Sequence, residues 1–365
     1  RTTQGGNMQG GGANSEQATQ LSLVDLDPEV LSLALSRCTV REQCAASLSC
    51  KLFSLLIAEN RLEATYLVSS VSSETKSLLA ELEPKLKAPP SVGVLFANTG
   101  RERRRELTAL ARSLPPAMHL VAAEVDTLVG TLPDGSLSVR NDSGLALTLG
   151  AFPEAEVGSF TVERANGEVA EQLQEQGALT PGWKVIVLMS CGSGSNMLPN
   201  LLGRLQGAHP EAAILGGIAT GDWLLRCHAH RLRFLRSGVV GLMFRGNVPL
   251  NALVCRGDPT PQLRVAQEEV AAQGKSILGG LMFTCTARHE AADAKAFTTV
   301  FPSVPVVGLP CGGEIGPRAR STPGGTQTGD AALQGFTAVY GLFAVPERSR
   351  AVPLYFPDIA AAYEE

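Results

Sequence analysis

Apolar residues in this chain gather into short runs that end in a small polar side chain, and three of these runs are almost evenly spaced. They end at Asn98, Cys191 and Cys285, which are separated by 93 and 94 residues. Each run is followed by a helical pattern and then by a second apolar run. Repeats of this length are supersecondary units that bury their apolar faces against one another. The pattern therefore predicts a strand–helix–strand unit that occurs three times.

The second and third copies match over several further elements. The matched segments are 210–216 with 302–308, Gly221-Asp222 with Gly313-Glu314, and 237–243 with 337–343. The first two matches keep a constant offset of 92 residues and the last has an offset of 100, which indicates an insertion in the third copy. Additional strand-plus-helix pairs lie between the copies, at 157–176 and 251–273. The predicted fold class is α+β, with strands in mixed or antiparallel sheets.

The N-terminal part of the chain has a different pattern. Residues 1–20 are rich in Gly, Gln and Asn and predict a disordered leader. From there to residue 66, apolar residues recur at three- and four-residue intervals, which predicts a bundle of short helices. The expected organisation is a leader (1–20), a helical region (21–66), a helix and linker (67–90), an N-terminal part of the repeated module (91–182), its C-terminal part (183–345) and a tail (346–365).

Composition narrows the class of protein. The 365 residues are 44% hydrophobic and 18% charged with a net charge of −4, which argues against a general partner for nucleic acid or membrane surfaces. No apolar run reaches the roughly 18 residues that span a bilayer. The eight scattered cysteines indicate free thiols in a reducing compartment, the cytoplasm or the nucleus. Cys227-His228-Ala229-His230 lacks a second ligand pair, so neither a metal nor another cofactor is predicted.

Within the helical region, residues 26–56 resemble an F-box. The resemblance implies a three-helix motif that docks on the Skp adaptor of a cullin-RING ubiquitin ligase. Three short amphipathic helices bury little apolar surface alone, which independently favours an outside partner. Cys38 and Phe53 replace the leucine and tryptophan that are common in the family. The residues that the resemblance places at the adaptor are Leu26, Pro28, Glu29, Val30, Leu31 and Leu35. Alternatively, these helices cover the first repeat as an N-terminal cap.

Residues 90–345 resemble the FIST domain, most closely over 279–285, 301–308 and 312–316. An F-box followed by this domain implies the substrate-recognition subunit of an SCF-type E3 ubiquitin ligase, which directs protein ubiquitination and proteasomal degradation without bond chemistry of its own. The expected partners are a Skp-type adaptor, a cullin-RING scaffold and a protein substrate. The alternative function is an intracellular signal-transduction sensor in which the FIST part binds a small metabolite.

Several residues at the predicted strand ends are candidates for ligand or substrate binding. Gly312 and Gly313 allow the backbone to approach a ligand closely, and Glu314 places a carboxylate there, as Asp222 does in the second copy. Cys285 ends a strand, with Arg288 and His289 near enough in sequence to favour its thiolate. Cys191 occupies the matched position of the second copy. A cysteine-dependent enzyme centred on Cys285 is a third hypothesis, and plain turn formation and core packing are the structural alternatives.

Overall fold

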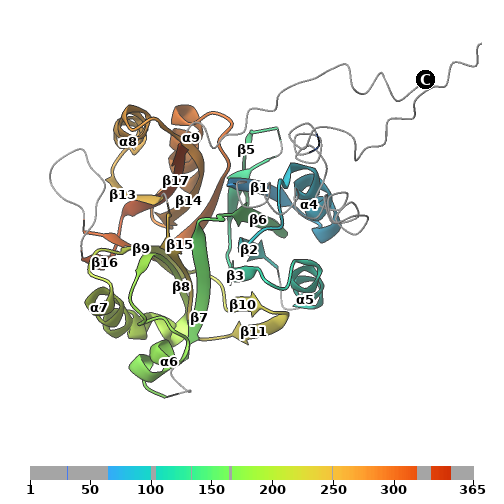
Figure 1. The fold of residues 1–365 in the computed structure, drawn as a ribbon. Coiled ribbons are helices and arrows are strands. Elements are labelled where there is room, and N and C mark those ends of the chain that lie inside the picture. The colour runs from blue at the N-terminus through green and yellow to red at the C-terminus, as the bar shows by residue number, and fades with distance from the viewer. Residues whose placement is uncertain are drawn as a thin grey trace, which may run out of the picture.

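The computed structural model describes Leu31 and residues 65–99, 104–132, 134–163, 167–248, 250–318 and 330–346. These residues form a six-stranded sheet and an eleven-stranded sheet, both with parallel and antiparallel pairs, together with helices (Figure 1). The predicted α+β class with mixed sheets is confirmed. The predicted F-box helices lie outside the described residues, Leu31 apart.

The described residues form three modules with the same order of elements, except that the third has one strand fewer. The first consists of β1 (Tyr66–Ser72), α4 (Thr75–Leu82), the 3-10 turn η2 (Glu83–Lys85), β2 (Val92–Asn98), α5 (Arg104–Ser113), β3 (His119–Glu124), β4 (Leu128–Thr131), β5 (Leu137–Arg140) and β6 (Gly144–Ala151). The second consists of β7 (Ala155–Val162), α6 (Val169–Glu175), β8 (Trp183–Cys191), the 3-10 turn η5 (Gly192–Met197), α7 (Leu198–Ala208), β9 (Ala213–Ala219), β10 (Leu224–His228), β11 (Arg231–Leu235) and β12 (Gly238–Gly246). The third consists of β13 (Leu250–Arg256), α8 (Thr260–Ala272), β14 (Lys275–Cys285), α9 (Glu290–Val300), β15 (Val306–Pro317), β16 (Ala331–Gln334) and β17 (Thr337–Pro346).

The strand order repeats as the elements do. It is β1-β6-β2-β3 in the first module, β7-β12-β8-β9 in the second and β13-β17-β14-β15 in the third. In each, the second and third strands along the chain are parallel, as the helix between them requires, and the last strand is antiparallel to the second. The predicted threefold repeat is therefore confirmed, with two more strands and one more helix per copy than the predicted strand–helix–strand unit.

The three modules are joined in a ring by strand pairing. β10 of the second module pairs with β3 of the first, the distal half of β15 of the third pairs with β9 of the second, and β4 of the first pairs with β15 of the third, all antiparallel. Each module thus adds a strand to the edge of another. This exchange covers sheet edges that would otherwise expose unpaired backbone groups.

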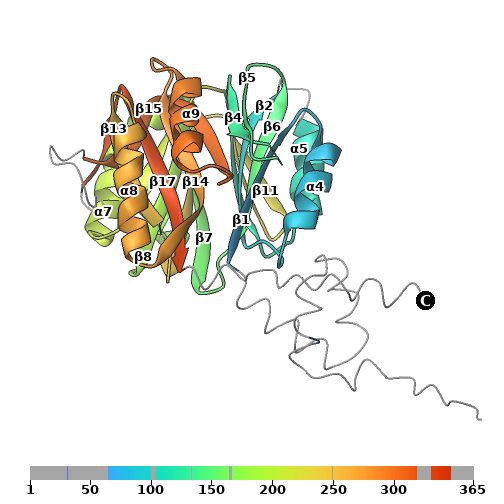
Figure 2. The ribbon, with the colours of Figure 1, turned by 90° about the horizontal axis from the view of Figure 1, so that it is seen from above.

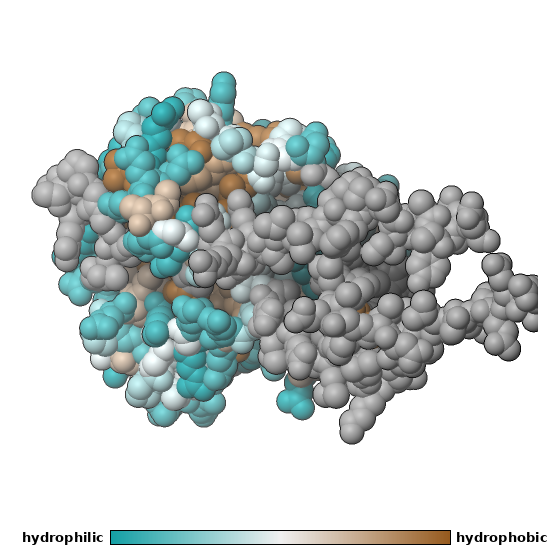
Figure 3. Space-filling view, turned by 45° about the horizontal axis from the view of Figure 1, so that its top comes forward, coloured by the Kyte–Doolittle hydropathy of each residue, from teal (hydrophilic) through white to brown (hydrophobic). Residues whose placement is uncertain are grey.

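The described residues form four layers, with two sheets at the centre and helices on both outer sides. The two sheets pack on each other through one apolar cluster that draws Phe96 from the first module, Val187 from the second and Phe283 from the third. Helices α4 and α5 cover the outer face of the six-stranded sheet, and α6 to α9 cover the outer face of the other (Figure 2). Their polar sides face outward, and the molecular face in Figure 3 is largely hydrophilic, with smaller apolar patches. No helix among the described residues is long and apolar enough to cross a membrane.

The structure differs from the sequence prediction most clearly at the start of the first module. Residues 67–90 were expected to be a helix and a linker, but β1 occupies Tyr66–Ser72 and pairs along its whole length with β6. The helix expected over 74–87 ends as α4 at Leu82. Pro84 explains this end, because it cannot donate the hydrogen bond that an α-helix requires and is tolerated only in the first turn of η2.

Candidate functional site

The carboxyl end of β14 lies beside the middle of β15, and the turn that leads into β17 reaches the same place. Cys285 pairs with Cys311 across the parallel ladder, and Thr284 pairs with Ala338 across the antiparallel one. The segments 311–314 and 335–337 therefore meet at Cys285. We call this group, consisting of Cys285, Cys311, Gly312, Glu314 and Phe336, the third-module rim.

Glu314 lies inside the rim, not on its surface. Its side chain is fully buried, and its carboxylate accepts hydrogen bonds from the Thr337 backbone N–H (3.2 Å) and Oγ1 (2.7 Å). The Cys311 thiol lies 3.7 Å from the other carboxylate oxygen. The sequence placed this carboxylate beside a ligand, whereas the structure uses it to tie β15 to the start of β17. Gly313 is also buried, and Gly312 is exposed.

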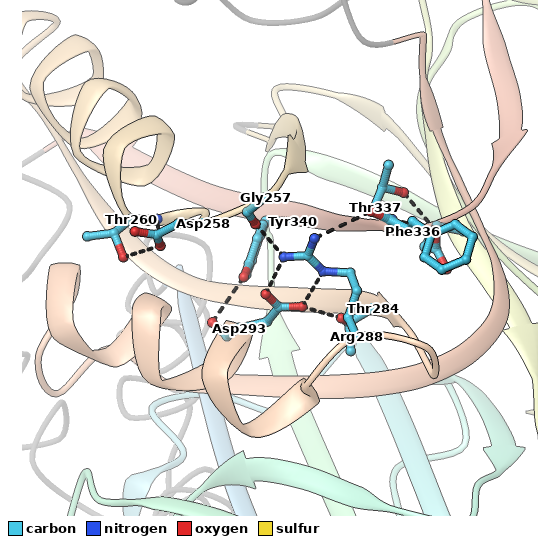
Figure 4. A network of polar contacts seen from close by, with 10 residues as sticks. Gly257, Asp258, Thr260, Thr284, Arg288, Asp293, Phe336, Thr337 and Tyr340 are labelled. Carbon is cyan, nitrogen blue, oxygen red and sulfur yellow. Dashed lines mark hydrogen bonds and ion pairs between the residues drawn. The ribbon is translucent and has the colours of Figure 1, made fainter.

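Arg288 is held in a polar network next to the rim (Figure 4). Its Nη2 lies 2.6 Å from Asp293 Oδ1 and its Nε 2.9 Å from Oδ2, while the remaining donors reach the carbonyls of Gly257 and Phe336. Asp293 is buried and also accepts a hydrogen bond from Thr284 Oγ1 (2.5 Å). The hydrogen bonds to Asp293 raise the pKa of Arg288 above its usual range. Through Arg288, this network holds α9 against the loop after β13, at Gly257, and against the turn before β17, at Phe336.

The expected pairing of Arg288 with Cys285 is therefore not formed. The guanidinium is used by Asp293 and by two carbonyls, so it does not serve as the charge that favours a Cys285 thiolate. His289 is exposed at the N-cap of α9 and makes no side-chain capping bond. Cys285 itself is buried, with 8% of the residue exposed at the end of β14.

The matched positions of the second module are placed differently. Cys191 is fully buried, its thiol points to the Leu235 carbonyl, and burial, then the nearby Asp222 and Glu124, raises its pKa to about 11. Asp222 lies on an exposed loop, and its backbone N–H donates to Glu124 Oε2 (2.7 Å). Asp222 thus marks the junction of the first and second modules, and neither residue joins the third-module rim.

Phe336 is a rim residue that sequence analysis did not identify. Its side chain is 71% exposed, and with Leu333 (47%) it is one of two exposed large hydrophobic residues among the described positions. Phe336 has a φ of +59°, and its carbonyl accepts from Arg288 Nη1 (3.4 Å). A clue was present in the sequence, since Gln334-Gly335-Phe336 forms a polar turn followed by an unexpected aromatic residue.

A depression of about 370 Å³ adjoins the network. It is lined by Gly257, Asp258, Pro259, Arg288, His289, Ala292 and Asp293. Asp258 Oδ1 accepts from the backbone N–H (2.9 Å) and Oγ1 (2.7 Å) of Thr260 at the start of α8. Among the predicted ligand-binding residues, only Arg288 reaches this depression.

No group of three or more His, Cys, Asp or Glu side chains that could hold a metal ion occurs in the described part of the chain.

The predicted adaptor-binding residues fall almost entirely outside the described ranges. Leu31 alone is placed, in a helix, and is 2% exposed. Its side chain is thus not on the surface of the free chain. Leu26, Pro28, Glu29, Val30 and Leu35 lie outside the described residues, and their contact with an adaptor stays a prediction.

Comparisons with known proteins leave the family open. No family model matches the chain, and no curated protein matches it. Among solved structures, the chain is similar to the cyanuric acid hydrolase from A. caulinodans, with 12% identity, a TM-score of 0.38, and coverage of 77% of this chain and 99% of that one. This neighbour is a hydrolase, which contradicts the prediction of a subunit without catalysis, and that prediction is withdrawn. A similarity this low assigns no reaction to the chain.

Proposed function

We propose that this chain is the client-binding subunit of an SCF-type ubiquitin ligase and that it holds its client at the third-module rim. The observation that carries the proposal is the exposure of Phe336, at 71%, on a turn that the structure holds in place. Leu333, which is 47% exposed, precedes it by three residues in β16. Large exposed apolar side chains that gather at one place on a surface are characteristic of protein interaction sites.

The rim favours binding because Phe336 is already fixed. Its carbonyl is held by Arg288, and the next residue, Thr337, is held by Glu314 through both its N–H and its hydroxyl. An aromatic residue whose backbone is ordered before binding loses less conformational entropy on association and can serve as a hot spot. A Cβ atom at Gly312 would have no atom within 4 Å, so this part of the rim is open to a partner.

The resemblance to F-box proteins supplies the other half of the proposal. Residues 26–56 would dock on a Skp-type adaptor, so that a client at the rim is held near a charged ubiquitin-conjugating enzyme. Such tethering raises the effective concentration of client lysines at the reacting thioester. The ligase would act in the cytoplasm, the nucleus or both.

A photo-crosslinker placed at the rim tests the proposal. The full chain with p-benzoylphenylalanine at Gly335 or Phe336 would be expressed in cells treated with a cullin-activation inhibitor and then irradiated. We expect a crosslinked protein whose ubiquitination requires residues 21–66, and the same capture should fail when the crosslinker replaces Glu156, an exposed residue of β7. Equal crosslinking from the rim and from Glu156 would contradict the proposal. So would a captured protein whose ubiquitination does not depend on residues 21–66.

The depression beside Arg288 favours a second candidate function, that of a small-ligand sensor. Its 370 Å³ is sufficient for a metabolite, and Asp258 and His289 offer polar contacts. Screening amino acids and related metabolites by thermal shift would test it. A ligand that raises the melting temperature of the wild type, but not of Asp258→Ala, supports the sensor function, and the absence of any shift counts against it.

A further inference from the structure

Cys285 and Cys311 are two thiols at directly paired positions of neighbouring strands. They are register partners at the end of the parallel ladder between β14 and β15. Neighbouring strands are about 4.8 Å apart, and disulfides join residues whose Cα atoms are about 4.4–6.8 Å apart. The backbone therefore places these two residues within the range of a disulfide, although both are free thiols in this structure.

The two side chains also lie on the same face of the sheet. Cys311 belongs to the central apolar cluster, as do Leu281 and Phe283, which precede Cys285 at alternate positions of β14. The Cys285 thiol is close enough to contribute to the elevated pKa of Cys311, after burial and Glu314. Room for the Cys311 sulfur exists because β9 has a glycine beside it, where a Cβ at Gly217 would come within 2.8 Å of Sγ.

The two thiols differ in access and in chemistry. Cys285 is 8% exposed at the end of its strand, next to the exposed Thr286 and Gly312, so it is the thiol of the two that lies nearer to solvent. Cys311 is fully buried, and its thiol lies 3.7 Å from the buried Glu314 carboxylate. A nucleophilic thiol must lose its proton as it attacks, and Glu314 is a proton acceptor at that distance. Cys285 is thus placed to react first and Cys311 to react second.

We propose that Cys285 and Cys311 form a reversible disulfide when a hydroperoxide oxidises Cys285, with Glu314 accepting the proton of Cys311. In the first step, the Cys285 sulfur attacks one peroxide oxygen, the O–O bond breaks, and Cys285 sulfenic acid and water form when the oxidant is hydrogen peroxide. In the second, the Cys311 sulfur attacks the sulfenic sulfur, an S–S bond replaces the S–O bond, and the proton on Glu314 leaves with hydroxide as water. The two sulfurs lose two electrons in total, and the peroxide gains them.

The second module provides an internal comparison. Cys191 ends β8 as Cys285 ends β14, but the residue beside it on the parallel strand, one position beyond the Ser190–Ile218 pair, is Ala219. Cys191 therefore lacks the second thiol on the neighbouring strand, and it is fully buried. The proposed chemistry is specific to the third module. Because the bond would span two adjacent strands of a ladder, we expect it to be readily reduced.

Peptide mass spectrometry tests the proposal on the full-length protein. The reduced chain would be treated with hydrogen peroxide, free thiols would be blocked with N-ethylmaleimide, and the digest would be searched for linked peptides. We expect one dominant linked pair, Cys285 with Cys311, two hydrogens lighter than the separate peptides and released by dithiothreitol. Sulfenic or sulfinic acid at Cys285 without that linked pair, or a dominant link between other cysteines, would overturn the proposal.

Variants test the roles of Cys311 and Glu314, with Cys191 as the control. Cys311→Ala should stop the reaction at Cys285 sulfenic acid, which dimedone captures, whereas Cys191→Ala should form the Cys285–Cys311 link as the wild type does. Glu314→Gln should form the link at least about tenfold more slowly at neutral pH while sulfenic acid formation keeps its rate. Circular dichroism confirms that each variant is folded. A Glu314→Gln rate equal to that of the wild type would remove Glu314 from the mechanism.

Discussion

Arg288 and Asp293 form a bidentate ion pair that joins the loop after β14 to α9, with two N–O distances of 2.6 and 2.9 Å. The Asp293 side chain is 3% exposed, so its charge depends on this partner. Removing one partner of a buried pair leaves the other uncompensated and typically costs about 3–5 kcal/mol. We therefore expect Arg288→Met to lower the free energy of unfolding by about 3 kcal/mol, as measured by urea denaturation.

A surface pair supplies the control for this prediction. Arg233 and Glu163 lie 3.0 Å apart with side chains that are 43% and 24% exposed. Exposed pairs contribute little, so Arg233→Met should change the free energy of unfolding by less than about 1 kcal/mol. Equal effects of the two substitutions would show that the Arg288–Asp293 pair has no special structural role.

Phe336 combines high exposure with a backbone conformation that is unfavourable for a side chain. Its φ of +59° suits glycine, so Phe336→Gly should stabilise the free chain by up to about 1 kcal/mol while removing the proposed client anchor. Chemical denaturation measures the first effect and client crosslinking the second. A clear loss of stability would indicate that the ring packs against the chain and is not available to a partner.

Two glycines of the second module are expected to respond in opposite directions to alanine. A Cβ at Gly216 would lie 1.8 Å from the Leu188 carbonyl oxygen, so Gly216→Ala should destabilise by at least about 2 kcal/mol. Gly203 lies within α7, where a Cβ meets no atom within 4 Å, so Gly203→Ala should stabilise by about 0.5–1 kcal/mol. Thermal or urea unfolding measures the change in stability that each substitution causes. A Gly216→Ala variant as stable as the wild type would contradict the close approach of β8 and β9.

The lowered pKa of His119 predicts how the stability of the fold depends on pH. Burial, and then the positive charges of His228 and Arg226, lower its pKa from 6.5 to about 4. His119 stacks on His228 at 3.8 Å, and its Nδ1 lies 2.8 Å from the Ser159 hydroxyl, to which Arg226 also donates. The unfolded chain binds more protons than the folded one between these two pKa values, so stability falls as the pH falls from about 6.5 to about 4.

The expected loss is about 1–2 kcal/mol, because partial solvent exposure of the ring screens the effect. His119→Gln should flatten the pH profile of unfolding in this window, and urea midpoints at pH 7 and pH 5 measure the difference. His209, which bonds to the Ala178 carbonyl in the second module, provides the comparison variant. A His119→Gln profile as steep as the wild type would contradict the assignment.

The repeated architecture could be predicted because each copy places an apolar run before a small polar residue. Asn98, Cys191 and Cys285 all end strands in the structure. β1 could not be predicted in the same way, since its sequence YLVSSVS alternates poorly, and most of its residues are buried because they contact β6 and α4. The ring of strand exchanges depends on pairing between distant segments, which periodicity does not reveal.

The candidate site was predicted only in part. Cys285, Gly312 and Glu314 were each predicted as binding candidates, and the parallel pairing of β14 with β15 places them near one another. The partner of Arg288 was missed because Asp293 lies on the following helix, and side-chain direction decides the pairing. Glu314 illustrates the same limit, since position at a strand end does not show whether a carboxylate faces solvent or the interior.

The most direct test of the proposed function is reconstitution of the full chain with a purified Skp-type adaptor, followed by size-exclusion chromatography. We expect a complex of chain and adaptor, loss of that complex in the double variant Leu26→Asp, Val30→Asp, and an unchanged complex in Phe336→Asp, which should lose only the client. Circular dichroism and the retained client crosslink show that the double variant is folded. An adaptor that elutes separately from the wild-type chain would contradict the ligase assignment.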